Sequence, residues 1–241
     1  MPPIIYSRDE NIVILTFNRP DQLNAVDTIL RDALYEYIMN LKEDATVDGV
    51  VLTGNGRGFC AGADLTEFGH YPSIIAKRKI RLQHDIWEEL RTLPKPIAVA
   101  MHGFAIGSGI EMAMICDFRF AAPGTKMALP EATLGTLPAA GGTQSLPRLV
   151  KQGEALSFAL KGNTVLPEEA LKMGLITSVF SKETLVNDTV AFMKNVTKYE
   201  RTASYIKQLV SCYADQALED RLKAEERVVT RVWQERLKVE R

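Results

Sequence analysis

The stretch GFAIGSGIEMAMICDFRF, residues 103–120, decides the fold. Two glycines flank Ser108 at the point where a helix would begin, and they open a long apolar run. Glu111 stands one turn into this run, and a second lone carboxylate, Glu131, follows in LPEATLGTLPAAGGTQ. A glycine loop between a strand and a helix is typical of an α/β domain, and carboxylates in apolar surroundings are candidates for chemistry.

The same order of elements precedes this stretch. IVILTF (12–17) and GVVLTG (49–54) predict buried strands, and the amphipathic ILRDALYEYIMNLKED (29–44) predicts a helix between them. PIAVAMHG (96–103) predicts the strand that leads into the glycine loop. Strands that alternate with helices pair in parallel, so the sequence predicts a parallel sheet with right-handed crossovers.

Weaker patterns complete the prediction. AKRKIRLQHDIWEELRTL (76–93) favours a helix with Ile80, Trp87 and Leu90 inward. FRFAAPGTKMALPE favours a strand and a turn, and ITSVF (176–180) favours one short strand.

Long charged helices are expected from about residue 183 to the end of the chain. We therefore predict an α/β core over residues 1–185 that holds the active site, and a helical C-terminal region over residues 186–241. An amphipathic extension without a core of its own packs on the main core or on a neighbouring subunit, so an oligomer is expected.

The composition is that of a globular protein with a large core: 46% of the 241 residues are hydrophobic and 24% are charged. The 29 basic and 30 acidic side chains give a net charge of -1. Such a chain offers no overall attraction for nucleic acid or for a membrane surface. The longest apolar stretches fall far short of the roughly 18 residues that span a bilayer. We expect neither a nucleic-acid nor a membrane partner.

The three cysteines, Cys60, Cys116 and Cys212, have neither CxxC spacing nor an even count, and the three histidines lack an HxxxH pattern. We expect reduced thiols and no metal. The segment MPPIIYSRDENIVILTF has the features of neither a secretory nor a transit peptide, so a cytoplasmic protein is expected.

A second loop of small residues, GRGFCAGADL (56–65), follows the strand at 49–54. Small side chains let a ligand approach the backbone, and a helix N-terminus presents unpaired N–H groups. If the two loops converge, the N–H groups of Ala63 and Ser108 would bind one oxygen, which suits thioester chemistry. The alternative is that both loops are tight turns required by short connections.

These segments resemble the crotonase, or enoyl-CoA hydratase, superfamily. The resemblance runs from VILTFNRPDQLNAV to ITSVF through VLTGNGRGFCAGADL, KPIAVAMHGFAIGSGIEMAMICDFRFA, LPEATLGTLPAAGGTQSLPRLV and GNTVLPEEALKMGLI. It implies a crotonase (ClpP-like) fold of repeated ββα units with a helical C-terminal extension.

The resemblance also implies the catalytic groups. The amides of Ala63 and Ser108 would form the oxyanion hole, and Glu111 and Glu131 would be the two glutamates of the hydratase members. Many relatives with other activities lack one of these glutamates, so the pair favours water addition. Two carboxylates in apolar surroundings should titrate as a coupled system with at least one raised pKa, and which is acid and which is base stays open. As alternatives, Glu111 would be a carboxylate near a helix N-terminus, where the helix dipole stabilises it, and Glu131 would cap a helix or form a salt bridge.

The resemblance assigns a second set of residues to the coenzyme A portion of the substrate. NRPDQLNAVD (18–27) matches the family loop along the nucleotide end, although Asp21 stands where relatives often carry lysine, and Arg19 is the compensating cation. The predicted binding residues are Arg19, Asn24, Ala25, Ala61, Asp64 and Leu65.

Other segments have weaker assignments. The basic residues of AKRKIR (76–81) are a phosphate partner or a solvated helix face. Leu65, Phe68 and Tyr71 are candidates for the acyl pocket or ordinary core. The role predicted for Gly141 and Gly142 is architectural. The histidines His84 and His102 and the thiols of Cys60 and Cys116 are assigned to packing or surface positions.

The end of the chain also departs from the family pattern. Relatives continue past VWQ with a further helix over the nucleotide, whereas this sequence ends in ERLKVER. That difference leaves open whether the carrier is coenzyme A or acyl-carrier protein.

The sequence therefore predicts a lyase: an enoyl-CoA hydratase that adds water reversibly to a trans-2-enoyl thioester with no metal or redox cofactor. Δ3,Δ2-enoyl isomerisation and dehydration of a 3-hydroxyacyl thioester are alternatives on the same fold, and an inactive acyl-CoA binding protein is the alternative from another class. A cytoplasmic homotrimer, or a hexamer built as a dimer of trimers, is the expected assembly.

Overall fold

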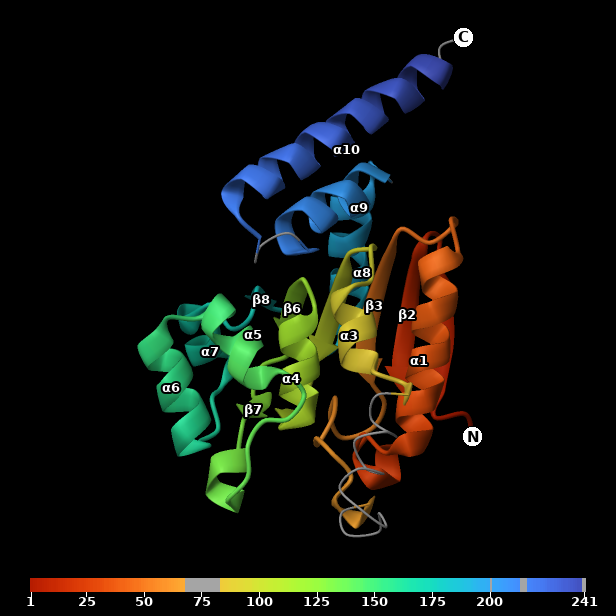
Figure 1. Ribbon diagram of the computed structural model, residues 1–241. Coiled ribbons are helices and arrows are strands. Elements are labelled where there is room, and N and C mark those ends of the chain that lie inside the picture. Colours follow the sequence, from red (N-terminus) through yellow and green to blue (C-terminus); the bar gives the residue numbers. More distant parts are fainter. Residues whose placement is uncertain (68–82, 200, 213–215, 240–241) are drawn as a thin grey trace.

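In the computed structural model, which describes residues 1–67, 83–199, 201–212 and 216–239, the core is a six-stranded sheet (Figure 1). Its strands lie in the order β1-β2-β3-β4-β6-β8. They span Ile4–Asp9 (β1), Ile12–Phe17 (β2), Gly49–Gly54 (β3), Ile97–Met101 (β4), Phe118–Ala121 (β6) and Ser178–Val179 (β8). A separate two-stranded sheet pairs β5 (Phe104–Ile106) with β7 (Lys126–Ala128).

The strands predicted at 12–17 and 49–54 are confirmed with the same bounds, and those predicted at 96–103 and 176–180 are shorter in the structure. Parallel pairing is confirmed from β2 through β3, β4 and β6 to β8. The first strand, β1, was not predicted from the sequence, and it pairs antiparallel with β2. The reason is a tight reversal at Glu10, whose φ of 53° lets the chain fold straight back.

Both faces of the central strands β3 and β4 are buried, and successive side chains of each strand point to opposite faces. Val50 and Leu52 belong to the main core cluster on one face, whereas Val51 belongs to a second cluster on the other. The same alternation separates Ile97 and Val99 from Ala98 in β4. A sheet buried on both faces explains why these strands read as continuous apolar runs.

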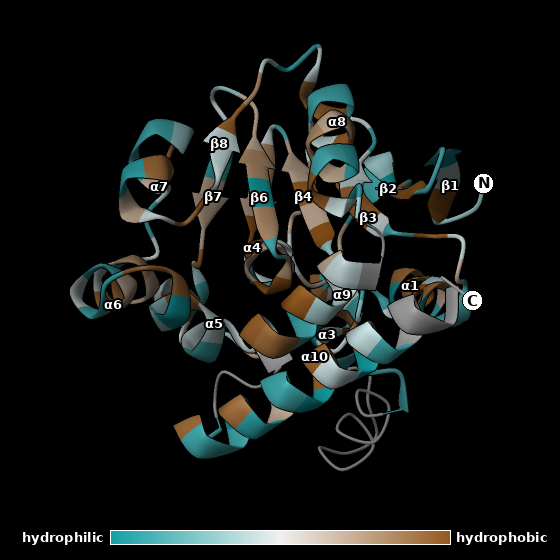
Figure 2. Cartoon of the chain, turned by 90° about the horizontal axis from the view of Figure 1, so that it is seen from above, coloured by the Kyte–Doolittle hydropathy of each residue, from teal (hydrophilic) through white to brown (hydrophobic). Residues whose placement is uncertain are grey.

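Helices cover each face (Figure 2). Helix α1 (Thr28–Glu43), close to the predicted 29–44, buries one stripe of side chains in the main cluster: Leu30, Leu34, Ile38 and Leu41. The others on the described chain are α3 (Ile86–Arg91), α4 (Ser108–Ile115), α5 (Gly142–Leu149), α6 (Gln152–Lys161), α7 (Pro167–Met173), α8 (Leu185–Thr197), α9 (Arg201–Lys207) and α10 (Leu218–Val239).

The helix predicted at 76–93 lies partly outside the described residues. Its described portion is α3, where Leu90 is buried and Trp87 packs against the core. Ile80 lies outside the described residues.

Helix α8 packs against the sheet, with Leu185, Val190 and Met193 in the second cluster. A partly buried ion pair joins α9 to the core, where Lys207 Nζ lies 2.7 Å from Asp117 Oδ2. Helix α10 lies beyond α9, away from the sheet (Figure 1). The division at residue 185 stays a prediction. Among the described helices, none combines the length and the apolar character needed to cross a bilayer.

Candidate active site

Two loops that follow neighbouring strands lie against each other. An isolated parallel bridge joins Cys60 to Ala105, and the N–H of Ile106 donates to the Cys60 carbonyl at 3.0 Å. Gly62 has a φ of +103°, and a β-carbon on it would stand 2.9 Å from the carbonyl oxygen of Ile106 and 3.5 Å from the amide nitrogen of Ser108. Only glycine allows this approach, which places residue 63 beside the start of α4.

The orientation of the Ala63 amide is set by its neighbours. The N–H of Val26 donates to the Gly62 carbonyl at 2.8 Å, and the N–H of Asp64 donates to the Val26 carbonyl at 3.0 Å. Ala63 lies between the two residues that bond to Val26. In a parallel bridge of this kind, the N–H of that middle residue points away from the opposite segment, here Val26.

The second amide is that of Ser108, the first residue of α4, whose N–H has no partner inside the helix. Within the described part of the chain, no group accepts a hydrogen bond from the N–H of Ala63 or of Ser108. Two N–H donors at one junction, one of them at a helix N-terminus, are the arrangement that stabilises an oxyanion.

Glu111 is buried in the first turn of α4. Its Oε1 accepts hydrogen bonds from the N–H of Ala140 at 2.9 Å and from the N–H of Gly142 at 2.8 Å. Gly142 is the first residue of α5, so the carboxylate caps a helix N-terminus. Backbone donors of this kind stabilise a carboxylate in its charged form.

Glu131 lies in a different environment, at the start of a short 3-10 turn (Glu131–Leu134). Its side chain is half-buried, and burial raises its pKa. The Oε2 atom is buried, and no described group donates a hydrogen bond to it. The pair is therefore asymmetric, since two backbone N–H groups donate to Oε1 of Glu111 whereas no described group donates to Oε2 of Glu131.

Gly107 connects the two glutamates. The N–H of Glu111 donates to the Gly107 carbonyl at 3.0 Å, and a β-carbon on Gly107 would stand 2.9 Å from Oε1 of Glu131. The same β-carbon would lie 3.9 Å from the α-carbon of Gly62, in the other loop. Both carboxyl-bearing segments and both amide-bearing loops therefore meet around one residue.

The residues predicted to bind coenzyme A are placed as follows. Arg19 faces inward: its guanidinium contacts Asp27 and the carbonyl of Ala25. Asn24 is buried, and its Nδ2 donates to the carbonyls of Asn55 and Gly58 at 2.9 Å each.

Three further predicted residues belong to the loop after β3. The N–H of Ala61 donates to the Leu23 carbonyl at 3.1 Å. Asp64 accepts from the N–H and hydroxyl of Thr66, which lower the pKa of its carboxyl. Leu65 is exposed. Phe68, Tyr71 and the basic segment 76–81 lie outside the described residues.

The remaining candidates have structural surroundings. Cys60 and Cys116 are buried free thiols, and burial raises the pKa of each to about 12. His84 Nδ1 lies 2.8 Å from Asp32 Oδ1, and its ring stacks on Tyr35. His102 Nε2 lies 3.1 Å from the Gly56 carbonyl. The side chain of Cys212 is outside the described set.

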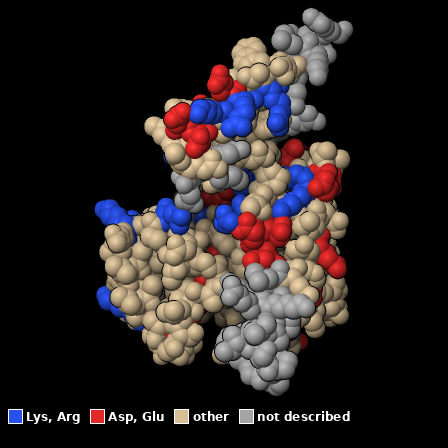
Figure 3. Space-filling view, viewed as in Figure 1, with Lys and Arg blue, Asp and Glu red and all other residues tan. Residues whose placement is uncertain are grey.

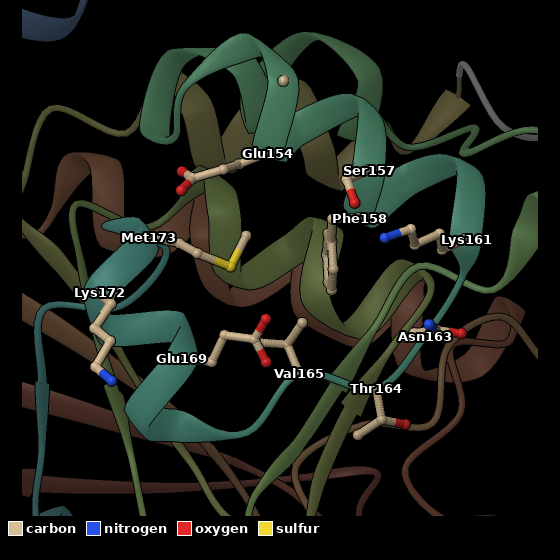
Figure 4. Close-up of a pocket in the computed structure, with 11 residues that line it drawn as sticks. Glu154, Ser157, Phe158, Lys161, Asn163, Thr164, Val165, Glu169, Lys172 and Met173 are labelled. Carbon is tan, nitrogen blue, oxygen red and sulfur yellow. The ribbon is translucent and has the colours of Figure 1, made fainter.

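A separate cavity of about 420 Å³ lies between α6 and α7, with Phe158 and Met173 along its walls (Figure 4). Its lining contains none of the predicted site residues. The backbone donors and carboxylates, not this cavity, therefore define the candidate site. The contribution of the Ala140 and Gly142 amides was not predicted, although the glycine pair at 141 and 142 is its visible signal.

Comparisons with known proteins identify the family. The model of one family, described as enoyl-CoA hydratase/isomerase, matches residues 7–239. The chain belongs to this family. Members are enzymes, and the hydratases among them are hydro-lyases.

Relatives in the enoyl-CoA hydratase/isomerase family include 2,3-dehydroadipyl-CoA hydratase of Escherichia coli, 36% identical over 76% of this chain and 71% of the relative. The mitochondrial enoyl-CoA hydratase of Pongo abelii is 31% identical over 92% of this chain and 76% of the relative. The solved enoyl-CoA hydratase of Bacillus anthracis superposes with a TM-score of 0.89 at 29% identity, covering 95% of this chain and 90% of that one. The predicted crotonase fold is confirmed.

Proposed function

We propose that this enzyme adds water reversibly across the 2,3 double bond of a trans-2-enoyl-CoA thioester to give the 3-hydroxyacyl thioester. The observation that carries the proposal is the place of Gly107: its carbonyl accepts from the N–H of Glu111, and its α-carbon lies against the Glu131 carboxylate and the loop that carries Ala63, next to Ser108. The names of the relatives, which include hydratases of crotonyl-CoA and of short-chain enoyl-CoA, support the choice of reaction.

In the proposed reaction the thioester oxygen accepts hydrogen bonds from Ala63 and Ser108, which stabilise the enolate. Glu111, whose Oε1 accepts two backbone N–H bonds, takes a proton from water as the oxygen bonds to carbon 3. Glu131, whose pKa is raised by burial, gives its proton to carbon 2.

The proton that Glu111 has gained then passes to Glu131 through solvent, which restores both groups. The net change is the addition of one water. Proton transfer and oxyanion stabilisation suffice for this chemistry, so the proposal includes no metal or redox cofactor.

The substrate carrier in this proposal is coenzyme A, and acyl-carrier protein is the alternative. The family description includes isomerases, so Δ3,Δ2-enoyl isomerisation is kept as the second candidate. Dehydration of a 3-hydroxyacyl thioester is the same reaction in reverse. An acyl-CoA binding protein without turnover would not need two carboxylates in one apolar site, which argues against that alternative.

We also propose self-association into a trimer or a dimer of trimers in the cytoplasm. Helix α10 exposes an apolar stripe that shares one face of the helix: Leu218, Leu222, Val229 and Trp233. Positive and negative side chains lie next to each other on the C-terminal helices (Figure 3). A surface of mixed charge around an apolar stripe suits another protein surface better than it suits nucleic acid.

The test is a spectrophotometric assay with crotonyl-CoA, in which hydration removes the absorbance of the conjugated thioester. The wild type should lose this absorbance, and Glu111→Gln and Glu131→Gln should each be severely impaired. Turnover of a 3-enoyl-CoA that survives the loss of one glutamate would favour isomerisation. Binding without any turnover would favour the inactive protein.

A further inference from the structure

Arg19 lies beside the loop that carries Ala63. One nitrogen of its guanidinium, Nη2, lies 2.6 Å from Asp27 Oδ2, and the other, Nη1, donates to the Ala25 carbonyl at 2.7 Å. Nη2 also lies 3.9 Å from Asp64 Oδ2. The side chain is only 15% exposed, so these contacts are partly shielded from water.

The three partners of Arg19 surround the bridge that orients Ala63. Ala25 and Asp27 are the two neighbours of Val26, whose N–H and carbonyl bond to Gly62 and Asp64 on either side of Ala63. The guanidinium therefore contacts the chain on both sides of Val26, at the backbone carbonyl of Ala25 and at the side-chain carboxylate of Asp27. It also reaches the residue that follows Ala63 on the other segment.

We propose that Arg19 is a positioning residue, which fixes the Ala63 N–H in its oxyanion-binding direction through the Val26 bridge. This inference rests on the proposed function. It differs from binding of the coenzyme A phosphates, the role predicted for Arg19 from the sequence, because the guanidinium is directed at partners inside the chain.

The chemistry of the side chain separates the two roles. A guanidinium is a planar fork that can donate in two directions at once, whereas an ammonium is a point charge that cannot reproduce both contacts. Lysine would serve nearly as well for a phosphate at the surface. It would not hold Ala25 and Asp27 together.

The experiment is therefore Arg19→Lys. We expect kcat to fall about 10- to 100-fold, since a donor misplaced by a fraction of an ångström loses much of its effect on the transition state. The KM for the enoyl-CoA should stay unchanged. Arg91→Lys is the matched control, because Arg91 is exposed and pairs with Glu88 on the surface.

A second readout follows the oxyanion hole itself. The carbonyl stretching frequency of a saturated acyl-CoA, labelled with carbon-13 at the thioester, falls when the oxygen is bound by two N–H donors. We expect a smaller fall in Arg19→Lys than in the wild type and in Arg91→Lys. A wild-type kcat and a wild-type carbonyl shift in Arg19→Lys would overturn the inference, as would a change confined to KM.

If Arg19→Lys does not fold, Asp27→Asn provides the test. Asparagine keeps an oxygen for the N–H of Leu30, which Asp27 caps, but loses the ion pair with Arg19. The same lower kcat and smaller carbonyl shift are expected, and wild-type values would refute the inference. The saturated thioester does not turn over, so a wild-type protein that shifts the carbonyl without hydrating crotonyl-CoA would contradict the proposed function alone.

Discussion

The side chain of Glu131 lies against the backbone of Gly107, so closely that a β-carbon on Gly107 would stand 2.9 Å from Glu131 Oε1. Gly107 has a φ of 52°, a conformation that other residues rarely adopt. Steric room and backbone conformation both require glycine here. Any side chain at Gly107 would therefore displace the Glu131 carboxylate.

Gly107→Ala should reduce kcat for crotonyl-CoA hydration by at least about 100-fold, because it displaces Glu131 and the adjoining Ser108 amide. Backbone strain should also lower the free energy of unfolding by about 1 to 3 kcal/mol. Gly124→Ala is the control, since Gly124 has a φ of 75° and nothing within 4 Å of an added β-carbon. It should lose stability but keep kcat, as measured by steady-state kinetics and denaturant unfolding. Equal losses of kcat would refute the role of Gly107.

Glu131→Gln removes the proposed proton donor while keeping the size of the side chain. We expect kcat to fall by about 10² to 10⁴-fold, the usual contribution of a general acid. A saturated acyl-CoA cannot be hydrated, and its binding to the variant, measured by calorimetry, should be retained. If hydration proceeds at the wild-type rate, Glu131 is not the donor.

Glu111→Gln should also lower kcat by about 10² to 10⁴-fold, because a neutral amide cannot take a proton from water. The amide oxygen can still accept from Ala140 and Gly142, so the fold should persist. Circular dichroism checks the fold and the crotonyl-CoA assay checks the activity. Glu226→Gln, on the exposed surface of α10, should behave as the wild type.

The raised pKa of Glu131 makes stability depend on pH. A carboxyl whose pKa is higher in the folded state than in the unfolded state contributes stability that is present at low pH and lost as the pH rises through the folded-state value. Glutamine does not ionise, so Glu131→Gln should not lose this stability as the pH rises. Its melting temperature relative to the wild type should therefore be higher at pH 8 than at pH 4, and a difference independent of pH would contradict the desolvation of Glu131.

Trp233 and Leu222 lie in the exposed apolar stripe of α10. If this stripe is buried between copies of the chain, Trp233→Glu combined with Leu222→Glu should dissociate the assembly, because a buried unpaired charge is costly. Light scattering with size-exclusion chromatography measures the mass. An unchanged mass would show that α10 does not hold the oligomer, whereas Asp220→Asn, on the opposite side of α10, should leave the mass unchanged.

Strands with continuous apolar runs were predictable from the sequence, as the matching bounds of β2 and β3 show. The antiparallel first strand was not, because IIYSRD carries one buried residue and depends on pairing with β2 rather than on its own pattern. The shortness of β8 has a similar cause, since only Ser178 and Val179 find partners in the sheet.

The candidate site shows the same limits. The glycine-flanked Ser108 and the lone Glu111 and Glu131 were recognisable as chemical residues. The inward direction of Arg19 was not predictable, because the sequence around an arginine before proline does not tell whether its side chain faces solvent or an internal carboxylate. Its partners Ala25 and Asp27 are brought into place by the tertiary bridge between Val26 and Ala63, which no local pattern encodes.

The most direct test of the central claim is to react crotonyl-CoA with the enzyme in water enriched in heavy oxygen and to locate the label by mass spectrometry. We expect 3-hydroxybutanoyl-CoA with one heavy oxygen on carbon 3, formed by the wild type and nearly lost in both Glu111→Gln and Glu131→Gln. An unlabelled product, or full labelling in either variant, would contradict the claim that the two glutamates together add water beside the oxyanion hole.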